Sequence, residues 1–424
     1  MRVLLLSWEY PPRVVGGLGR HVGALARNLA AQGHEVHVVT RGHEDDDLPD
    51  DEVADGVRII RVGEAAPHLD FQTDLVPWVL AFNNRVQAAA HRLIREDGPF
   101  DVVHAHDWLV AYAAAGVKDA WDLPLVATVH ATEYGRHQGW LPGPMNKLIH
   151  QIEWWLTYEA RRVITCSQYM HDQVADIFAK PAATLDVVPN GVDVRDFALP
   201  DDEVAAFRRD LAPADTNVVL FAGRLEYEKG VQTVLDALHG LRERVGPTEF
   251  LIAGVGTYSE ELRRKVDELD LAEHVRFTGF LEDHELRLHY AAADVAVAPS
   301  IYEPFGLVAV EAMACGTPVV VGDTGGLREV VSGGHGLTFT PQDAAHLTEV
   351  LARVLSDGQL AAELTARGRD RILARYDWAG VARATVDVYE RTIREEATLR
   401  GEPRPPLRQL LRAAPILELD EIAG

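Results

Sequence analysis

The chain has 424 residues, 47% of them hydrophobic, and a formal net charge of −24 at pH 7. This length suits about two to four domains of roughly 100–200 residues, each with a core of its own. The acidity disfavours nucleic acid and anionic membranes as partners, and no apolar run approaches the roughly 20 residues that span a bilayer. The two cysteines, Cys166 and Cys315, are too few for a disulfide framework and favour a cytoplasmic location.

Short apolar segments alternate with helical patterns twice along the chain. Their continuous Val, Leu and Ile content is typical of parallel strands that are covered on both faces. The predicted strands are residues 3–7, 35–40, 58–62, 101–105, 125–129 and 162–165 in the first half, and 218–222, 250–253, 275–278, 295–298 and 319–322 in the second. We therefore predict two doubly wound α/β units that meet near the turn Asn190–Asp193.

We divide the chain into an amino-terminal Rossmann-like domain, residues 1–197, and a carboxyl-terminal one, residues 198–377. Ligands of open α/β sheets bind at the carboxyl ends of the strands, so we expect the active site between the domains. Residues 397–424 form a tail with several prolines, and its last part has helical spacing but weak caps. We predict that this tail is loosely held.

An acidic run from Glu44 to Glu52 contains an Asp-x-Asp pattern, which in other enzymes binds a metal ion together with a nucleotide. No predicted strand leads into this run, and Pro49 interrupts it. We therefore predict a solvated loop rather than a metal site.

A glycine-rich segment, Gly16-Gly17-Leu18-Gly19, follows the first predicted strand and opens a helix that extends to Gln32. Glycines at such a junction let the backbone approach a ligand and direct N–H groups at an anion. The alternative is a tight turn that needs glycine for its conformation alone. The spacing is not G-x-G-x-x-G, and no acid follows about 20 positions later at a strand end, which argues against a dinucleotide cofactor.

Two cations, Arg224 and Lys229, follow the first strand of the second half in the segment GRLEYEKG. At the carboxyl edge of a sheet this pair fits a diphosphate, which Arg binds with two hydrogen bonds and Lys with a mobile charge. The pair would neutralise the charge that develops as a bond from a sugar to phosphate breaks. The alternative is a pair of surface cations that balance Glu226 and Glu228.

Two acids, Glu303 and Glu311, lie in the segment SIYEPFGLVAVEAMACGTPVV, whose pattern predicts a loop, a helix and the next strand. Glu303 falls in the loop and Glu311 falls one to two turns into the helix, beside a helix end that favours an anion. One acid would hold sugar hydroxyls and the other a ribose, with a diphosphate on the helix end. The segment therefore predicts a nucleotide-sugar site.

Histidines end two of the predicted strands. His130 would bond a sugar hydroxyl or support a developing positive centre, and a purely structural histidine is the alternative. Asp107 and Trp108 would contact a sugar acceptor. His104 and His106 would point to one face at a spacing that suits zinc, but no third ligand is evident nearby, so we predict no metal site.

An aromatic stripe, Trp154, Trp155 and Tyr158, lies in a predicted helix. Packing of the helix on the core is the favoured interpretation, and a wall for the acceptor is the alternative. The sequence has no G-x-S-x-G elbow, no H-E-x-x-H pair and no P-loop, so the chemistry has no obvious covalent nucleophile or metal.

Taken together, GGLG, His130, GRLEYEKG and EPFGLVAVE resemble the retaining glycosyltransferases of family 4, over roughly residues 1–395. The phrases SWEYPP, DVVHAHDWLVA and HATEYGRHQGW are similar to the glycogen-synthase-like branch, and most of all to the actinobacterial α-1,4-glucosyltransferases of glycogen and methylglucose polysaccharide synthesis. The resemblance implies the GT-B fold, with two Rossmann-like domains facing across a cleft. It also implies that the last long helix, about residues 378–396, packs back on the first domain.

The resemblance implies roles at the matching positions. These are catalytic roles for His130, Glu303, Arg224 and Lys229, and donor binding by Gly16, Gly17, Phe305, Gly306, Leu307 and Glu311. Asp107, Trp108 and Tyr134 would contact the acceptor. Bacterial glycogen synthases of the neighbouring family carry a lysine before the two glycines, whereas this chain has Val14 there, beside Arg13. This departure points to family 4 and leaves the donor nucleotide open.

The implied activity is transfer of glucose from UDP- or ADP-glucose to an α-1,4-glucan or maltooligosaccharide, with retention and without a required metal or other cofactor. The alternative is a family 4 hexosyltransferase, mannosyl or glucosyl, that acts on a lipid or small-molecule acceptor. A noncatalytic carbohydrate- or nucleotide-binding protein is a third hypothesis, which the intact set of Arg224, Lys229, Glu303 and His130 disfavours.

Overall fold

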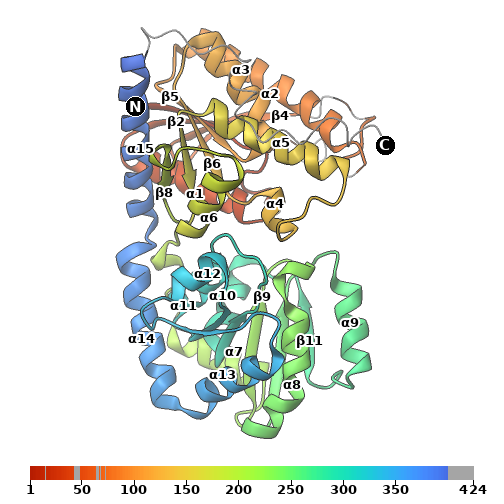
Figure 1. Ribbon diagram of the computed structural model, residues 1–424. Coiled ribbons are helices and arrows are strands. Elements are labelled where there is room, and N and C mark those ends of the chain that lie inside the picture. Colours follow the sequence, from red (N-terminus) through yellow and green to blue (C-terminus); the bar gives the residue numbers. More distant parts are fainter. Residues whose placement is uncertain (15, 43–47, 64–65, 67, 72, 400–424) are drawn as a thin grey trace. The chain divides into compact units, whose positions relative to one another are not determined.

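The computed structural model describes residues 1–14, 16–42, 48–63, 66, 68–71 and 73–399. The chain forms two compact units, which Figure 1 shows. Unit 1 is Met1–Pro189 together with the helix that begins at Trp378, and unit 2 is Asn190–Asp377. The centre of the acidic run, residues 43–47, and nearly all of the predicted tail, residues 400–424, lie outside the described residues.

The division between the units falls at the turn Asn190–Asp193 and not at residue 197, where we divided the domains. The segment after this turn belongs to unit 2 because Val192 donates its backbone N–H to the carbonyl of Tyr376 (2.7 Å) and pairs with Asp377. The last long helix, α15 (Trp378–Leu399), belongs to unit 1 and extends beyond residue 396.

Unit 1 contains one sheet of eight strands in the order β3-β4-β2-β1-β5-β6-β7-β8. Neighbouring strands are parallel, apart from the antiparallel edge pair β3 and β4. The strands are β1 (Arg2–Leu6), β2 (Glu35–Arg41), β3 (Asp51–Ala54), β4 (Val57–Val62), β5 (Val102–His106), β6 (Leu125–Val129), β7 (Arg162–Thr165) and β8 (Leu185–Val187). The central strand β1 is buried on both sides because helices cover both faces.

Helices α1 (Gly17–Ala31) and α15 cover one face of this sheet, as Figure 1 shows, and their apolar residues share a core with β1 and β2. Helices α2 (Leu75–Asp97), α3 (Ala111–Trp121) and α5 (Pro144–Glu159) lie on the other face. They connect strands in the opposite direction across the sheet from α1, and right-handed connections in opposite directions lie on opposite faces. The remaining elements of unit 1 are α4 (Glu133–Arg136), α6 (Gln168–Ile177) and the 3-10 turns η1 (Trp108–Val110) and η2 (Ala182–Thr184).

Unit 2 contains one parallel sheet of six strands in the order β11-β10-β9-β12-β13-β14. The strands are β9 (Asn217–Ala222), β10 (Thr248–Ala253), β11 (Val275–Gly279), β12 (Val295–Ala298), β13 (Val319–Gly322) and β14 (Leu337–Phe339). Helices α8 (Val231–Val245), α9 (Ser259–Glu268) and α13 (Ala344–Ser356) share a core on one face. The other elements are η3 (Val194–Phe197), α7 (Asp201–Leu211), η4 (Tyr227–Lys229), α10 (Asp283–Ala292), α11 (Leu307–Cys315), α12 (Gly325–Val331) and α14 (Gly358–Arg375).

All eleven predicted strands are present, and three short strands were not predicted. Strand β3 is a largely exposed edge strand, so it lacks the apolar pattern on which the prediction depended. Strands β8 and β14 have three residues each, too few to show a period. No helix within the described ranges is long and apolar enough to cross a membrane.

In each sheet the winding direction of the chain reverses between two neighbouring strands. These are β1 and β5 in unit 1, and β9 and β12 in unit 2. At such a switch point the connections leave the carboxyl ends of the two strands in opposite directions and form a crevice that binds ligands. His106 ends β5 at the first switch point, and the segments of Arg224 and Glu303 follow the strands of the second.

Candidate active site

An ion pair joins two predicted site residues in unit 2. Lys229 Nζ lies 2.7 Å from Glu303 Oε2, and the two side chains are only 17% and 15% exposed. Lys229 ends η4, which follows β9, whereas Glu303 lies in the loop after β12. The switch point therefore brings together residues that are 74 positions apart in sequence. The alternative in which Lys229 balances Glu226 or Glu228 at the surface is wrong.

Arg224 follows β9 after a single glycine and keeps 44% of its side chain exposed. Its guanidinium lies 3.9 Å from Glu228, a long contact that contributes little in exposed surroundings. In the free protein Arg224 therefore behaves as the alternative describes, as a surface cation near Glu228. This loose contact leaves the guanidinium free to turn towards an anionic ligand.

Close backbone contacts bind the segment of Lys229 to the segment of Glu303. Ile301 donates its backbone N–H to the carbonyl of Glu228 (2.8 Å). Gly230 has a φ of +72°, and a Cβ at this position would lie 2.0 Å from the carbonyl oxygen of Pro299. Only glycine permits both the conformation and the approach, which explains the last residue of GRLEYEKG.

A third segment, after β13, supports the Glu303 loop from the other side. Gly326 donates its N–H to the carbonyl of Glu303 (2.9 Å), and Thr324 Oγ1 donates to the carbonyl of Ile301 (3.0 Å). A Cβ on Gly326 would lie 2.5 Å from Phe305 Cα, so no larger residue fits without moving the loop. The position of Glu303 thus depends on backbone contacts from two sides.

Helix α11 begins at Leu307, and the first amides of any helix have no acceptor within it. Gly306 precedes the helix with a φ of +103°, and the ring of Phe305 packs in the interior against Tyr376 (5.7 Å). The ring of Phe305 is therefore occupied by core packing, and donor binding by this residue stays a prediction that concerns its backbone. Glu311, one turn into α11, is buried and accepts a hydrogen bond from the Tyr290 hydroxyl (3.3 Å).

The glycine pair Gly16 and Gly17 lies at the junction of β1 and α1 in unit 1. Gly16 has a φ of −157°, and Gly17 is the first helical residue, so neither adopts a positive φ. Cβ atoms on these residues would meet nothing within 4 Å. The turn does not require glycine here, and the tight-turn alternative is wrong. Gly19 differs, since its Cβ would lie 3.0 Å from Glu9.

His130 follows β6 and is held by Asp107, which follows the neighbouring strand β5. Its backbone N–H donates to Asp107 Oδ1 (2.7 Å), and Asp107 has an unusual φ of +60°. Burial raises the pKa of the Asp107 carboxyl to about 6, although this hydrogen bond opposes the shift. Burial, helped by the charge of Arg136, lowers the pKa of His130 to about 3. Its imidazole is therefore neutral at pH 7.

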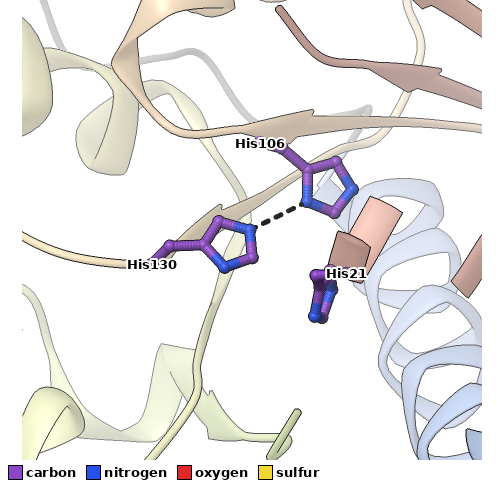
Figure 2. Close-up of side chains that lie close together, drawn as sticks. All are labelled: His21, His106 and His130. Atoms are coloured by element: carbon purple, nitrogen blue, oxygen red, sulfur yellow. Dashed lines mark hydrogen bonds between the residues drawn. The ribbon is translucent and has the colours of Figure 1, made fainter. Parts of the chain in front are cut away.

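Three imidazoles gather at this edge of unit 1, as Figure 2 shows: His21 from α1, His106 from the end of β5, and His130. We call them the histidine cluster. His106 Nδ1 lies 3.2 Å from His130 Nε2. His21 lies across from both, with ring centroids 5.5 Å from His106 and 4.7 Å from His130. Sequence reasoning found no other candidate ligand near His104 and His106, whereas the fold places His21 and His130 beside His106.

His104 lies beside His106 with the ring centroids 4.1 Å apart, so the two rings share a face as predicted. Its two nitrogens are occupied by the hydroxyls of Tyr389 and Thr128, both at 2.7 Å. His104 is therefore a packed, fully bonded residue, and His106 is the one that joins the cluster.

The other predicted acceptor contacts are half-buried near the same edge. Trp108 begins η1 directly after Asp107, and Tyr134 lies in α4 with its ring 6.0 Å from His150. The aromatic stripe of α5 divides: Trp155 packs against Tyr112 of α3 (5.1 Å), whereas Trp154 stacks on the exposed Tyr158 (5.8 Å). The prediction that the stripe packs on the core is therefore wrong for Tyr158. An acceptor wall there stays a prediction.

Several residues of these sites were not predicted. They are His21, Tyr290, Thr324 and Gly326. The one available signal was His21 in GRHV, which lies four residues, about one helical turn, after Gly17. Tyr290 and Thr324 reach their partners through the sheet topology and have no signal in the local sequence.

The chemistry at the carboxyl edge of the sheet differs between the two units. Unit 2 combines an exposed arginine, a lysine–carboxylate pair and helix amides, a set that binds phosphate groups and hydroxyls. Unit 1 offers a neutral imidazole and a carboxyl whose protonation changes near neutral pH, which suits hydrogen bonds to uncharged hydroxyls.

Comparisons with known proteins identify the family. Residues 15–196 match the family described as Glycosyltransferase Family 4, and residues 203–371 match the one described as Glycosyl transferases group 1. The chain is 41% identical to a glycogen synthase of Mycobacterium tuberculosis, covering 96% of this chain and 97% of that protein. It is 33% identical to a D-inositol 3-phosphate glycosyltransferase of Kineococcus radiotolerans, covering 95% and 98%.

A solved structure agrees with these relatives. Sucrose-phosphate synthase from Thermosynechococcus elongatus superposes with a TM-score of 0.81 at 27% identity, over 93% of this chain and 100% of that one. Its likeness extends over both units, which are doubly wound α/β domains. The chain is therefore a glycosyltransferase of the GT-B fold, and it belongs to the family that combines a family 4 amino-terminal domain with a group 1 carboxyl-terminal domain.

Proposed function

We propose that this enzyme transfers glucose from UDP- or ADP-glucose to the nonreducing end of an α-1,4-glucan or maltooligosaccharide, with retention of the anomeric configuration. The observation that carries the proposal is the Lys229–Glu303 pair at the switch point of unit 2, beside the first turn of α11. The glucose donor and the glucan acceptor are supported by the relative named glycogen synthase, which aligns over nearly the whole chain.

In this proposal unit 2 binds the donor. Arg224 turns from its weak contact with Glu228 to the diphosphate, and Lys229 contributes a second positive charge. The amides of Phe305, Gly306 and Leu307 bind phosphate oxygens. Glu303 accepts hydrogen bonds from hydroxyls of the transferred glucose.

Glu311 completes the donor site. Its carboxylate is carried by α11 and accepts a hydrogen bond from the Tyr290 hydroxyl, and in this proposal it also accepts hydrogen bonds from the ribose hydroxyls. In unit 1, the open space at Gly16 and Gly17 admits the donor phosphate or the incoming acceptor close to the backbone.

The proposed chemical step takes place on one face of the sugar. The bond from C1 to the diphosphate oxygen breaks, the acceptor hydroxyl oxygen bonds to C1, and its proton passes to the leaving diphosphate. Arg224 and Lys229 stabilise the negative charge that develops on that leaving group. The neutral imidazole of His130 bonds a sugar hydroxyl without opposing the positive charge that develops at C1. No enzyme nucleophile takes part.

A second acceptor class has independent support. Five relatives at 32–34% identity are named D-inositol 3-phosphate glycosyltransferases, and they too align over most of this chain. A small molecule that bears a phosphate is therefore the second candidate acceptor. Arg136, exposed beside Asp107 and His130, is a cation that such a phosphate would meet.

The test measures nucleoside diphosphate release from UDP-glucose, ADP-glucose and GDP-mannose, each alone, with maltooligosaccharide and with inositol 3-phosphate. Release from a glucose donor that depends on maltooligosaccharide supports the proposal and names the nucleotide. Release that depends on inositol 3-phosphate, or only on GDP-mannose, overturns the glucan assignment and leaves the family assignment intact. Proton NMR of the first product distinguishes retention, an α linkage, from inversion.

A further inference from the structure

We propose that the histidine cluster of unit 1, His21, His106 and His130, is a binding site for a divalent transition metal ion, and that zinc is the ion it suits best. Imidazole nitrogens are the ligands that zinc, copper and nickel share, and three histidines with one open position form a common zinc arrangement. The three residues come from α1, from the end of β5 and from the loop after β6.

The rings already have the spacing of a zinc site. Their centroids are 4.7, 5.5 and 5.5 Å apart. Three imidazoles around one tetrahedral zinc ion, with Zn–N bonds of about 2.0–2.1 Å, place their ring centroids roughly 5 Å apart. The three rings, drawn in Figure 2, therefore have about the centroid spacing that the ion imposes.

The nitrogens are close to the required separation as well. His106 Nδ1 and His130 Nε2 lie 3.2 Å apart, and two nitrogens bound to one tetrahedral zinc lie about 3.3 Å apart. One nitrogen from each of the three rings lies within 4.8 Å of the others. The widest pair therefore has to approach by at most about 1.5 Å for both nitrogens to bind one zinc ion.

His106 also has an unsatisfied polar atom. Its Nε2 is buried and has no hydrogen-bond partner among the described residues, although buried polar atoms are nearly always paired. His106 is fully buried, and His104 packs against its ring. Because Nδ1 is the nitrogen that faces His130, an ion would bind Nδ1 and leave the proton of His106 on this Nε2.

The surroundings hold the cluster in place. His21 packs edge-on against Trp378 (5.2 Å), and the backbone of His130 is fixed by Asp107. Metal sites depend on neighbours of this kind, because they orient the ligands before the ion arrives. The site therefore needs little rearrangement to bind an ion.

Binding of an ion has a consequence for the reaction, and this part rests on the proposed function. Zinc on His130 takes up the nitrogen that would bond the donor sugar and adds positive charge where the sugar becomes positive at C1. We therefore expect zinc to inhibit transfer reversibly and a chelator to restore it. The reaction itself needs no metal in this scheme.

The test of the site uses Co²⁺ as a spectroscopic substitute for zinc on the full-length protein freed of metal with EDTA. Tetrahedral Co²⁺ bound to histidine absorbs visible light far more strongly than the hydrated ion, so one equivalent should give a visible band that zinc then displaces. No band, or a band that grows without saturation at one equivalent, overturns the proposal. This measurement is independent of whether the enzyme acts on glucan.

Variants assign the band to the cluster. His106→Gln and His21→Gln should each weaken Co²⁺ binding by more than about 100-fold, because loss of a ligand exceeds the roughly 10–100-fold cost of losing an outer partner. The matched control is His284→Gln, an exposed histidine of unit 2 that bonds Glu203. Circular dichroism and thermal melting establish that each variant is folded, and His21→Gln serves if the fully buried His106 does not tolerate the change. Equal binding by the control and a folded cluster variant overturns the assignment.

The inhibition arm compares zinc titrations of transfer by the wild type and by His284→Gln, followed by EDTA. Inhibition at the concentration that displaces Co²⁺, with recovery after EDTA, supports the regulatory consequence. A saturated cobalt site with unchanged transfer overturns the inhibition and, with it, the proposed role of His130, while the metal site itself stands.

Discussion

Lys229 and Glu303 form a half-buried ion pair, with Nζ 2.7 Å from Oε2, so the cation proposed for the diphosphate and the acid proposed for the sugar already meet in the free enzyme. Each side chain offsets the cost of holding the other out of water. A donor that brings a negative phosphate to Lys229 and hydroxyls to Glu303 replaces this contact from both sides. The ion pair thus keeps both groups in position. We expect replacement of Glu303 and replacement of Lys229 to have different effects on donor binding and on transfer.

Replacement of the acid should separate binding from chemistry. In Glu303→Gln we expect transfer to fall by at least about 100-fold, the loss typical of a group that acts in the transition state. Binding of the nucleoside diphosphate product should be unchanged or tighter, because Lys229 no longer has a competing anion. Steady-state kinetics and calorimetry measure the two effects. Glu260→Gln, an exposed acid in the first turn of α9, is the control, and wild-type turnover in Glu303→Gln would refute the site.

Replacement of the cation should affect binding and chemistry together. We expect Lys229→Met to raise the KM for the donor and to lower the single-turnover rate, because the leaving diphosphate loses a charge that stabilises it. The variant also leaves Glu303 without its partner in half-buried surroundings. Donor titrations at fixed acceptor measure both quantities. Rates that match the wild type at limiting and at saturating donor would exclude the proposed role of Lys229.

The position of the Glu303 loop should depend on Gly326. A methyl group there meets Phe305 Cα at 2.5 Å, so Gly326→Ala should displace the loop, destabilise the fold by about 1–3 kcal/mol and reduce transfer. The control is Gly358→Ala at the start of α14, where a Cβ meets nothing within 4 Å. Thermal melting and kcat are the measurements. A fully active Gly326→Ala enzyme would show that the loop tolerates movement.

The Gly16–Gly17 junction should respond in the opposite way. Because a Cβ fits there without contact, Gly17→Ala should leave the melting temperature unchanged, and an added methyl group should block the approach of a ligand to the backbone. We expect a loss of transfer without a loss of stability. Gly63→Ala, which also has open space, is the control. An active Gly17→Ala enzyme would place the ligand elsewhere.

Asp107 should give the enzyme a pH dependence near 6. Burial raises the pKa of its carboxyl from 3.8 to about 6, and only the carboxylate accepts hydrogen bonds on both oxygens. The acceptor kcat/KM should therefore rise with pH through about 6, and Asp107→Asn should lower it and remove this step. The measurement is the pH profile of the acceptor kcat/KM for the wild type and for Asp107→Asn. A rise near pH 6 that persists in the variant would belong to another group.

The same shift has a consequence for stability that does not depend on function. Between about pH 4 and 6 the folded protein keeps a proton on Asp107 that the unfolded chain has lost, so this residue makes folding less favourable as pH rises through that window. Compared with Asp107→Asn, the wild type should therefore lose stability over this range. Denaturant unfolding at several pH values measures the difference.

The sequence predicted those features that depend on neighbouring residues alone. Apolar runs located eleven strands, and the spacing of Glu303 and Glu311 located one acid in the loop and the other in α11, because one continuous segment makes the loop and the helix. The requirement for glycine at position 230 is only partly local, because it comes from a φ of +72° and also from the approach of Pro299, which is distant in sequence.

Contacts that depend on the order of strands could not be predicted in this way. His21, His106 and His130 are far apart in sequence, and they meet only because α1 follows β1 and because β5 and β6 are neighbours. The partner of Lys229 was missed for the same reason, since the nearby Glu226 and Glu228 were the obvious candidates in sequence. Strand β3 was missed because an exposed edge strand has no apolar face to reveal it.

The return of α15 to unit 1 affects the order in which the chain acquires its structure during synthesis. Unit 2 is one uninterrupted stretch, Asn190–Asp377, and all of it leaves the ribosome before α15 does. Val22 and Leu25 of α1 share a core with Val381 and Tyr389 of α15, so that face of unit 1 stays uncovered until then. The second unit can therefore finish folding first, and the amino-terminal one is completed only after it, by a helix that follows unit 2 in the sequence.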